Sequence, residues 1–483
     1  MKNRFLLLSA LLCGSGLFAQ TAPAGYQLRV AVNGYNNQYL YLGYHYGKIR
    51  ALADSTPVKN GVALFKGAKA LPGGIYFLVS PKKEILCELL LDKAQQFSIQ
   101  IDTARPEAPV FKGSPDNTDF MAYTQFIQEK GRSINRAQEV LKSGDASPAD
   151  SVRLQQEMRS ANESILAYRK TYIRQHPQTM LATLFNALTE PAIPAASDHP
   201  KGVYDSSFAY RFFKDHYWDN IRFTDERLLR TPFFEQRLDR YFNDLVSPEA
   251  DSIKKEVDNM LGRSKGNFEM YKYLLTHFVQ RYINPTYMGQ DAVFVHLFEK
   301  YINGHPEVNW FTEKYTKYMT DRAYSLMANL IGNPAWDMSM TDTSGKLTTL
   351  YEVAAPFTVV CFWDPTCSHC KEMVPHLDSL FRHKWKQQGI QLFGVMTDGG
   401  KEAWLKYIRE NNLKDWIHVY QTEEQRDAER NSGRPGFRQL YDISQTPVLY
   451  LLDDQKRIIA KKLTYAQLDD LITLKQKNAN TPK

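Results

Sequence analysis

Cysteine is scarce in this sequence, with five residues in a chain of 483. A structural disulfide framework needs many cysteines in even pairs, so the sequence excludes a protein stabilised in that way. Cys367 and Cys370 are separated by two residues, whereas Cys13, Cys87 and Cys361 stand alone. One close pair beside isolated thiols is typical of cysteines that carry chemistry.

Long apolar runs and clusters of one charge are also missing. After residue 19 no apolar run reaches the roughly 20 residues that a transmembrane helix needs. The formal net charge of +7 is small for this length, and lysine and arginine form no block of the kind that binds nucleic acid. The sequence therefore predicts no nucleic-acid partner.

The N-terminus reads as a secretory signal. Met1–Ala19 has a basic start, a short apolar centre at Phe5–Leu12 and small residues before a cleavage point after Ala19. A lipoprotein with a lipid on Cys13 is the weaker alternative, because Leu12 stands where such signals need a small residue. We expect an exported protein, located in the periplasm of a Gram-negative bacterium.

The rest of the chain divides by pattern into three regions. Residues 26–104 contain short apolar runs between turn signals, which is typical of a small β-sandwich. These runs are Gln27–Val32, Gln38–Gly43, Val62–Lys66, Gly74–Ser80, Ile85–Leu91 and Gln96–Ile101. Residues 117–330 carry apolar residues at helical spacing and predict an all-α domain, whereas residues 331–477 mix strand-like and helical segments. We expect a multidomain protein with a β-sandwich, an all-α domain and an α/β domain in that order.

The α/β region holds the stretch on which the function depends. Val359–Trp363 is a β-branched and aromatic run that predicts a buried strand, and Asp364-Pro365 ends it. A helical pattern then follows, with Met373, Val374, Leu377, Leu380 and Phe381 on one face. Cys367 is therefore predicted to lie where a strand end meets a helix N-terminus.

This position favours thiol chemistry at Cys367. The first turn of a helix presents unpaired N–H groups and the positive end of its dipole, which stabilise a thiolate and lower the pKa of the thiol. Cys370 lies one helical turn further on, close enough to form a disulfide with Cys367. We expect Cys367 to attack, Cys370 to resolve the intermediate, and His369 between them to stabilise the thiolate.

These residues resemble the thioredoxin superfamily, most closely its exported TlpA/ResA-like branch. The matching positions are Phe362-Trp363 before Cys367-Ser368-His369-Cys370, then Lys371, Pro375 and Thr446-Pro447. The resemblance implies a thioredoxin-like fold for 331–477, preceded by a β-domain and a helical domain of unknown role. It also implies that Thr446 and a cis Pro447 face the two sulfurs, shape the docking of protein thiols and disulfides, and hinder metal capture. No cofactor is implied, because the disulfide itself carries two electrons, and the expected redox partner is linked to the membrane.

Three positions depart from the family. Cys361 stands where thioredoxins bury an acid, and Met373 stands where ResA-like proteins have a glutamate, which leaves Glu372 as a solvated first-turn carboxylate. His369 replaces the proline of reducing members and resembles oxidising and isomerising ones. We therefore expect a reduction potential above that of thioredoxin, although a reductase fed by a membrane electron carrier stays open.

The sequence also bears on two other functions of a close cysteine pair, zinc binding and peroxidase chemistry. A zinc half-site would need a second cysteine or histidine pair, and the sequence has none at ligand spacing. Peroxidase chemistry needs the pattern P-x-x-x-T-x-x-C, whereas Pro365, Thr366 and Cys367 are consecutive. The leading interpretation is an exported thiol–disulfide oxidoreductase with a Cys-Ser-His-Cys redox centre. The alternative is a cell-envelope binding or scaffold protein in which the redox domain is accessory.

Overall fold

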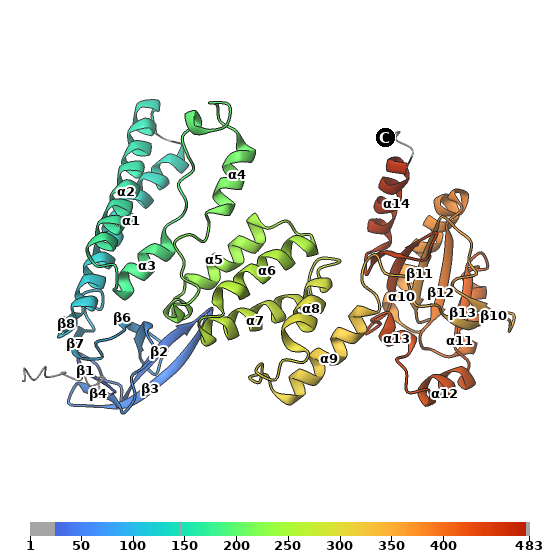
Figure 1. Ribbon diagram of the computed structural model, residues 1–483, viewed down its shortest axis with the longest axis horizontal. Helices are drawn as coiled ribbons and strands as arrows, with labels where there is room; N and C mark the ends of the chain where they lie inside the picture. The colour runs from blue at the N-terminus through green and yellow to red at the C-terminus, as the bar shows by residue number, and fades with distance from the viewer. Residues whose placement is uncertain (1–24, 145, 480–483) are drawn as a thin grey trace, which may run out of the picture. The chain divides into compact units, whose positions relative to one another are not determined.

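The computed structural model describes residues 25–144 and 146–479 (Figure 1). The signal peptide and lipidation predicted for the first 19 residues lie outside this part of the chain. The described chain forms two compact units that divide between Tyr241 and Phe242. The predicted order of a β-domain, a helical region and an α/β domain is confirmed, and the predicted domain boundaries stay predictions.

The first unit begins with an eight-stranded sheet in the order β6-β5-β2-β3-β4-β1-β7-β8. The strands are β1 Tyr26–Asn33, β2 Tyr39–Tyr46, β3 Ile49–Lys59, β4 Val62–Gly67, β5 Gly74–Val79, β6 Ile85–Leu91, β7 Gln96–Asp102 and β8 Val110–Lys112. Alternate side chains such as Leu28, Val30 and Ile99 are fully buried in its core. Strands β3 and β8 were not predicted, because their residues are mostly exposed and form no apolar alternation.

Helices complete the first unit. They are α1 Pro115–Ser143, α2 Pro148–Gln175, α3 Met180–Leu188, α4 Ser206–Asp215 and α5 Phe234–Arg240. The long helices α1 and α2 run alongside each other, and each starts with a proline after a serine (Figure 1). The buried Asn117 side chain fastens α1 to the sheet, because it accepts from Leu90 N at 2.7 Å and donates to Leu90 O at 2.8 Å.

The second unit opens with four α-helices: α6 Ala250–Ser264, α7 Phe268–Tyr282, α8 Asp291–Leu297 and α9 Glu313–Met327. The last of these is joined to the α/β domain by polar contacts. Ser325 Oγ donates to Gln439 O at 2.5 Å, Asn329 Nδ2 donates to Leu440 O at 2.9 Å, and Arg322 pairs with Asp442. These contacts fix the end of the helical region to the segment that leads into strand β14.

The α/β domain has a seven-stranded mixed sheet in the order β10-β9-β13-β12-β11-β14-β15. Its strands are β9 Ser339–Asp342, β10 Leu347–Thr349, β11 Phe357–Trp363, β12 Gln391–Met396, β13 Ile417–Tyr420, β14 Val448–Asp453 and β15 Ile458–Lys461. Its helices are α10 Ser368–Leu380, α11 Lys401–Glu410, α12 Glu423–Asn431, α13 Phe437–Leu440 and α14 Tyr465–Ala479. Central strand β11 is buried on both faces, with Val359 and Trp363 in one core and Val360 and Phe362 in the other.

Helix α12 was not expected from the apolar pattern, because none of its residues is buried. Its start is specified by a capping box in which the Thr422 hydroxyl and the Gln425 side chain each accept a backbone N–H of the other residue. Within the described chain, no helix combines the length and the apolar character needed to cross a membrane.

Candidate functional site

The loop after β11 places Cys367 at the N-terminus of α10. Cys367 is the N-cap residue, with φ −70° and ψ 129°, and its N–H donates to Asp364 O at 3.3 Å. The Asp364 carboxylate closes this loop, because its Oδ1 accepts from both Thr366 N and Thr366 Oγ1 at 2.7 Å. Strand, Asp-Pro turn and helix thus occur in the predicted order, and they hold Cys367 at the end of the central strand.

The two sulfurs of the pair have different environments. Cys367 is half-buried, and the backbone N–H of Cys370, the Thr446 side chain and the backbone N–H of His369 lower the pKa of its thiol. Cys370 is 1% exposed, and burial raises its pKa to about 11 even though Asp364 N donates to its sulfur at 3.4 Å. This asymmetry suits an accessible thiolate at Cys367 and a protonated reserve thiol at Cys370, although the roles assigned to them stay predictions.

The shifted pKa values make the two thiols separable by alkylation. A thiol with a lowered pKa becomes a thiolate, the reactive form, at a lower pH than an ordinary thiol of about 8.5. We expect iodoacetamide to label Cys367 first, with a rate that rises with pH and levels off at a lower pH than for an ordinary thiol, while Cys370 resists until near pH 11. Mass spectrometry of reduced protein across pH 5–11 measures both rates. Cys370 reacting first or at equal rate would contradict the assignment.

His369 contributes in a way that the sequence did not reveal. Its backbone N–H faces the Cys367 sulfur and helps to lower the pKa of that thiol. The imidazole is exposed, and among the described residues it makes no hydrogen bond or ion pair. The stabilisation visible at this position therefore comes from the main chain, and a role of the imidazole stays a prediction.

The structure brings Thr446 and Pro447 to the same site from the start of β14. The peptide bond between them is cis, as the resemblance implied, and the Cys367 thiol donates to Thr446 O at 3.6 Å. The contact joins residues 79 positions apart in the chain. All five predicted site residues, Cys367, His369, Cys370, Thr446 and Pro447, therefore lie together where β14 begins and α10 begins.

Cys361 of strand β11 shares a buried core with Cys370 and Trp363, and the centroid of the His418 ring lies 6.1 Å from that of the Trp363 ring. Cys361 is fully buried, and burial raises the pKa of its thiol well above the ordinary range, so a neutral thiol stands at the position where, as stated above, thioredoxins bury an acid. Burial lowers the pKa of His418 to about 4, so the imidazole is neutral at physiological pH. His418 Nε2 lies 2.8 Å from Leu413 O, whereas His418 Nδ1 and Trp363 Nε1 are buried without a hydrogen-bond partner among the described residues.

Sequence reasoning missed other residues near the pair. Tyr407 on α11 packs against Trp363 with ring centroids 5.4 Å apart, and burial together with the charge of Cys370 raises the pKa of its phenol. Leu463 and Tyr465 lie beside Pro447 in a pocket described below. None belongs to a motif, and only the folded chain brings them together. Among the residues that the structure describes, no three histidine, cysteine or acidic side chains gather as a metal site would require.

Two family models match this chain. Residues 331–470 match the AhpC/TSA family, and residues 153–324 match a domain of unknown function, DUF5106. A search of curated proteins finds no match.

Solved structures resemble parts of this chain. A domain of possible thiol-disulfide isomerase from Cytophaga hutchinsonii is 36% identical, covering 32% of this chain and 97% of its own, with a TM-score of 0.28. A thiol:disulfide interchange protein from Bacteroides sp. is 27% identical over 32% of this chain and 95% of its own, with a TM-score of 0.27. A thioredoxin-like protein from Bacteroides caccae is 20% identical over 59% of this chain and 98% of its own, with a TM-score of 0.45.

Proposed function

Because the chain belongs, through residues 331–470, to the thioredoxin-like AhpC/TSA family, we propose that it is an exported thiol–disulfide oxidoreductase acting on proteins through Cys367 and Cys370. The observation that carries this proposal is the asymmetry of the pair. A half-buried thiol with a lowered pKa stands at a helix N-terminus, and a buried thiol with a raised pKa stands one turn further on. Thiol–disulfide exchange needs an attacking thiolate and a resolving thiol arranged in this way.

The reaction proceeds in two exchanges. The Cys367 thiolate attacks one sulfur of a partner disulfide, so that a mixed disulfide forms and the partner's other sulfur leaves as a thiolate. Cys370 then gives its proton to that leaving thiolate and attacks the Cys367 sulfur. The intramolecular disulfide forms, and the partner's second sulfur leaves as a thiolate that takes from solvent the proton that Cys367 had released there. The partner gains two electrons and two protons, and the reverse sequence oxidises a partner dithiol.

The neighbouring groups each have a defined task in these steps. The N–H groups of His369 and Cys370 favour the Cys367 thiolate as nucleophile and as leaving group. The main chain at Thr446, 3.6 Å from the attacking sulfur, is placed to hold an extended segment of the partner. Burial keeps Cys370 protonated until the mixed disulfide has formed.

We further propose that this chemistry takes place outside the cytoplasm. The support is the pattern of Met1–Ala19, which reads as a secretory signal. In the periplasm, protein thiols and disulfides are the substrates, and a membrane-linked redox partner restores the pair after each turnover. Periplasmic extraction of the full chain, with alkylation of the pair before lysis, tests the location and the resting redox state together.

The direction of the reaction is tested by the reduction potential of the pair. Stabilisation of the Cys367 thiolate favours the dithiol and makes the disulfide a stronger oxidant, so we expect a potential above the roughly −270 mV of thioredoxin. Equilibration with glutathione buffers, followed by alkylation and mass measurement, gives this value. A two-electron transition above about −200 mV supports an oxidase or isomerase, and one near −270 mV or below indicates a reductase. The absence of any transition would contradict the proposed function.

Two variants of His369 separate its backbone from its imidazole. His369→Pro removes the N–H that faces Cys367. It is expected to lower the reduction potential, because the Cys367 thiolate loses part of its stabilisation. His369→Ala keeps this N–H and removes only the imidazole. If the reduction potential falls in the proline variant alone, the effect belongs to the main chain. If it falls equally in both variants, the effect belongs to the imidazole. If neither variant changes the potential, His369 has no part in the mechanism.

A further inference from the structure

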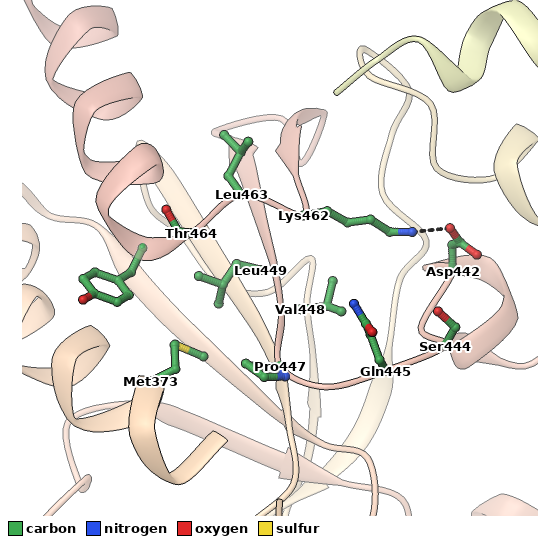
Figure 2. Close-up of a pocket in the computed structure, with 11 residues that line it drawn as sticks. Met373, Asp442, Ser444, Gln445, Pro447, Val448, Leu449, Lys462, Leu463 and Thr464 are labelled. Atoms are coloured by element: carbon green, nitrogen blue, oxygen red, sulfur yellow. Dashed lines mark hydrogen bonds and ion pairs between the residues drawn. The ribbon is translucent and has the colours of Figure 1, made fainter. Parts of the chain in front are cut away.

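An apolar pocket opens beside Pro447, on the side of α10 that carries Met373 (Figure 2). The apolar residues of its wall are Met373, Pro447, Val448, Leu449, Leu463 and Tyr465. The cavity volume is about 270 Å³, which is below the roughly 300–1,000 Å³ of sites that enclose a whole small molecule. A pocket of this size has room for one large side chain.

The position of the pocket indicates which molecule such a side chain belongs to. Pro447 follows Thr446, whose carbonyl oxygen lies 3.6 Å from the attacking sulfur of Cys367. A segment bound along Thr446 would therefore pass the mouth of the pocket while its own cysteine meets Cys367. Met373 adds adaptability to the wall, because the flexible thioether of methionine adjusts to side chains of different shapes.

A second, polar cavity continues from the first. Its volume is about 340 Å³, and it shares Asp442, Lys462 and Leu463 with the apolar pocket. The opposite wall comes from the helical region of the same unit, namely residues 284–289 and Arg322 of α9. The two cavities adjoin at these shared residues, and together they are called the groove, to which the helical region contributes one wall.

The polar cavity is lined by more cationic side chains than carboxylates. Three cations, Arg322, Lys461 and Lys462, line it together with two carboxylates, Asp291 and Asp442. Lys461 is buried against Asp291, whereas Arg322 and Lys462 share the single carboxylate of Asp442. Figure 2 shows Lys462 extending along the rim to Asp442, and 41% of its side chain is exposed. The accessible charge at the rim is thus positive.

We propose that this groove binds an extended segment of the substrate protein that has a large apolar residue near the reactive cysteine and an acidic residue further along. The inference rests on the proposed function and adds a sequence preference to it. Because Pro447 directly follows Thr446 and an extended chain advances about 3.3–3.6 Å per residue, the apolar residue lies a few positions from the cysteine and the acidic one beyond it. The helical region thereby forms part of the substrate site.

A peptide series tests the preference on the reduced full chain. Each peptide carries one cysteine activated as a mixed disulfide with thionitrobenzoate, and the release of this chromophore is followed in single turnovers. One set places Leu, Ala or Asp at one to three positions on either side of the cysteine, and a second places Glu, Gln or Lys at four to six positions. At one of these positions, we expect kcat/KM for the Leu peptide to be about tenfold higher than for the Ala peptide. Glu should exceed Lys several-fold, with a difference that shrinks as salt increases.

Matched variants assign any preference to the groove. Leu463→Glu should make kcat/KM for the Leu and Ala peptides nearly equal. Leu474→Glu, at an exposed leucine of α14, should preserve the difference between them. Lys462→Gln should remove most of the Glu preference, whereas Lys317→Gln, at an exposed lysine paired with Asp321, should not.

The outcomes separate this inference from the function on which it rests. Exchange that proceeds equally with all peptides overturns the groove and leaves the oxidoreductase intact. Preferences that survive Leu463→Glu and Lys462→Gln place recognition elsewhere and also overturn it. If folded protein exchanges with no peptide and with no glutathione buffer, the proposed function fails and the groove inference falls with it.

Discussion

Replacing Cys367 with serine is expected to lower the rate of disulfide exchange by at least about 1,000-fold, as removal of a catalytic nucleophile does in other enzymes. A serine hydroxyl is protonated at neutral pH and forms no bond with sulfur that a second thiol can resolve. Cys370 cannot take over, because it is 1% exposed and its pKa is raised to about 11. The measurement is the turnover of a protein disulfide by the full chain, with folding checked by circular dichroism.

Two further cysteine variants give this prediction its controls. Cys370→Ser should keep the attack and accumulate a mixed disulfide at Cys367, visible as a mass adduct that dithiothreitol removes. Cys87→Ala removes a buried thiol of the first unit, whose pKa is raised to about 12 by burial, and should leave exchange unchanged. A Cys367→Ser protein that still turns over disulfides would contradict the mechanism and favour a different nucleophile.

The features of this site that depend on residues close together in the sequence could be predicted. An apolar run, an Asp-Pro break and helical spacing are short-range signals, and they place Cys367 at the N-terminus of α10 as the structure does. The capping box of α12 was equally local, because Thr422 and Gln425 stand three residues apart, but a search for apolar periodicity passes over it. Strand β3 carried no such signal, since its ladder partners and not its own side chains specify it.

The contacts between residues far apart in the sequence could not be predicted from the residues themselves. Thr446 reaches Cys367 across 79 residues, and only the resemblance to a family pointed to it. Lys461 and Asp291 are 170 residues apart, and nothing in either local sequence marks a lysine or an aspartate that will be buried. Such pairs depend on which elements pack together, and helix and strand patterns do not carry that information.

Breaking the buried pair between Lys461 and Asp291 is expected to have the largest effect on stability. Lys461 on β15 and Asp291 on α8 are 4% and 5% exposed. The Lys461 ammonium uses all its donors, on Asp291 Oδ2 and on both oxygens of Asn329, at 2.7 Å to the backbone oxygen and 2.6 Å to Oδ1. Burial lowers the pKa of Lys461, and the Asp291 charge opposes that shift. These partners therefore favour the charged ammonium and offset the cost of its burial.

Asp291 depends on Lys461 even more strongly. Its Oδ1 is buried and accepts no hydrogen bond from any described residue, so Lys461 is the cation that compensates the carboxylate. Lys461→Met leaves this charge in the interior and should lower the free energy of unfolding by about 3–5 kcal/mol. Urea unfolding followed by tryptophan fluorescence reports on the second unit, because six of the seven tryptophans lie after residue 241.

The double variant Lys461→Met with Asp291→Leu decides between a charge effect and simple loss of packing. If the single variant suffers from an uncompensated charge, removing Asp291 as well should restore most of the stability, since apolar replacement of both partners of a buried pair is often neutral or stabilising. If packing were responsible, the two losses would add. The exposed pair Lys317–Asp321 is the reference, and Lys317→Met should cost less than about 1 kcal/mol. If Lys461→Met also lowers the free energy of unfolding by less than about 1 kcal/mol, water reaches the Asp291 carboxylate. The ion pair would then not be what holds α8 to strand β15.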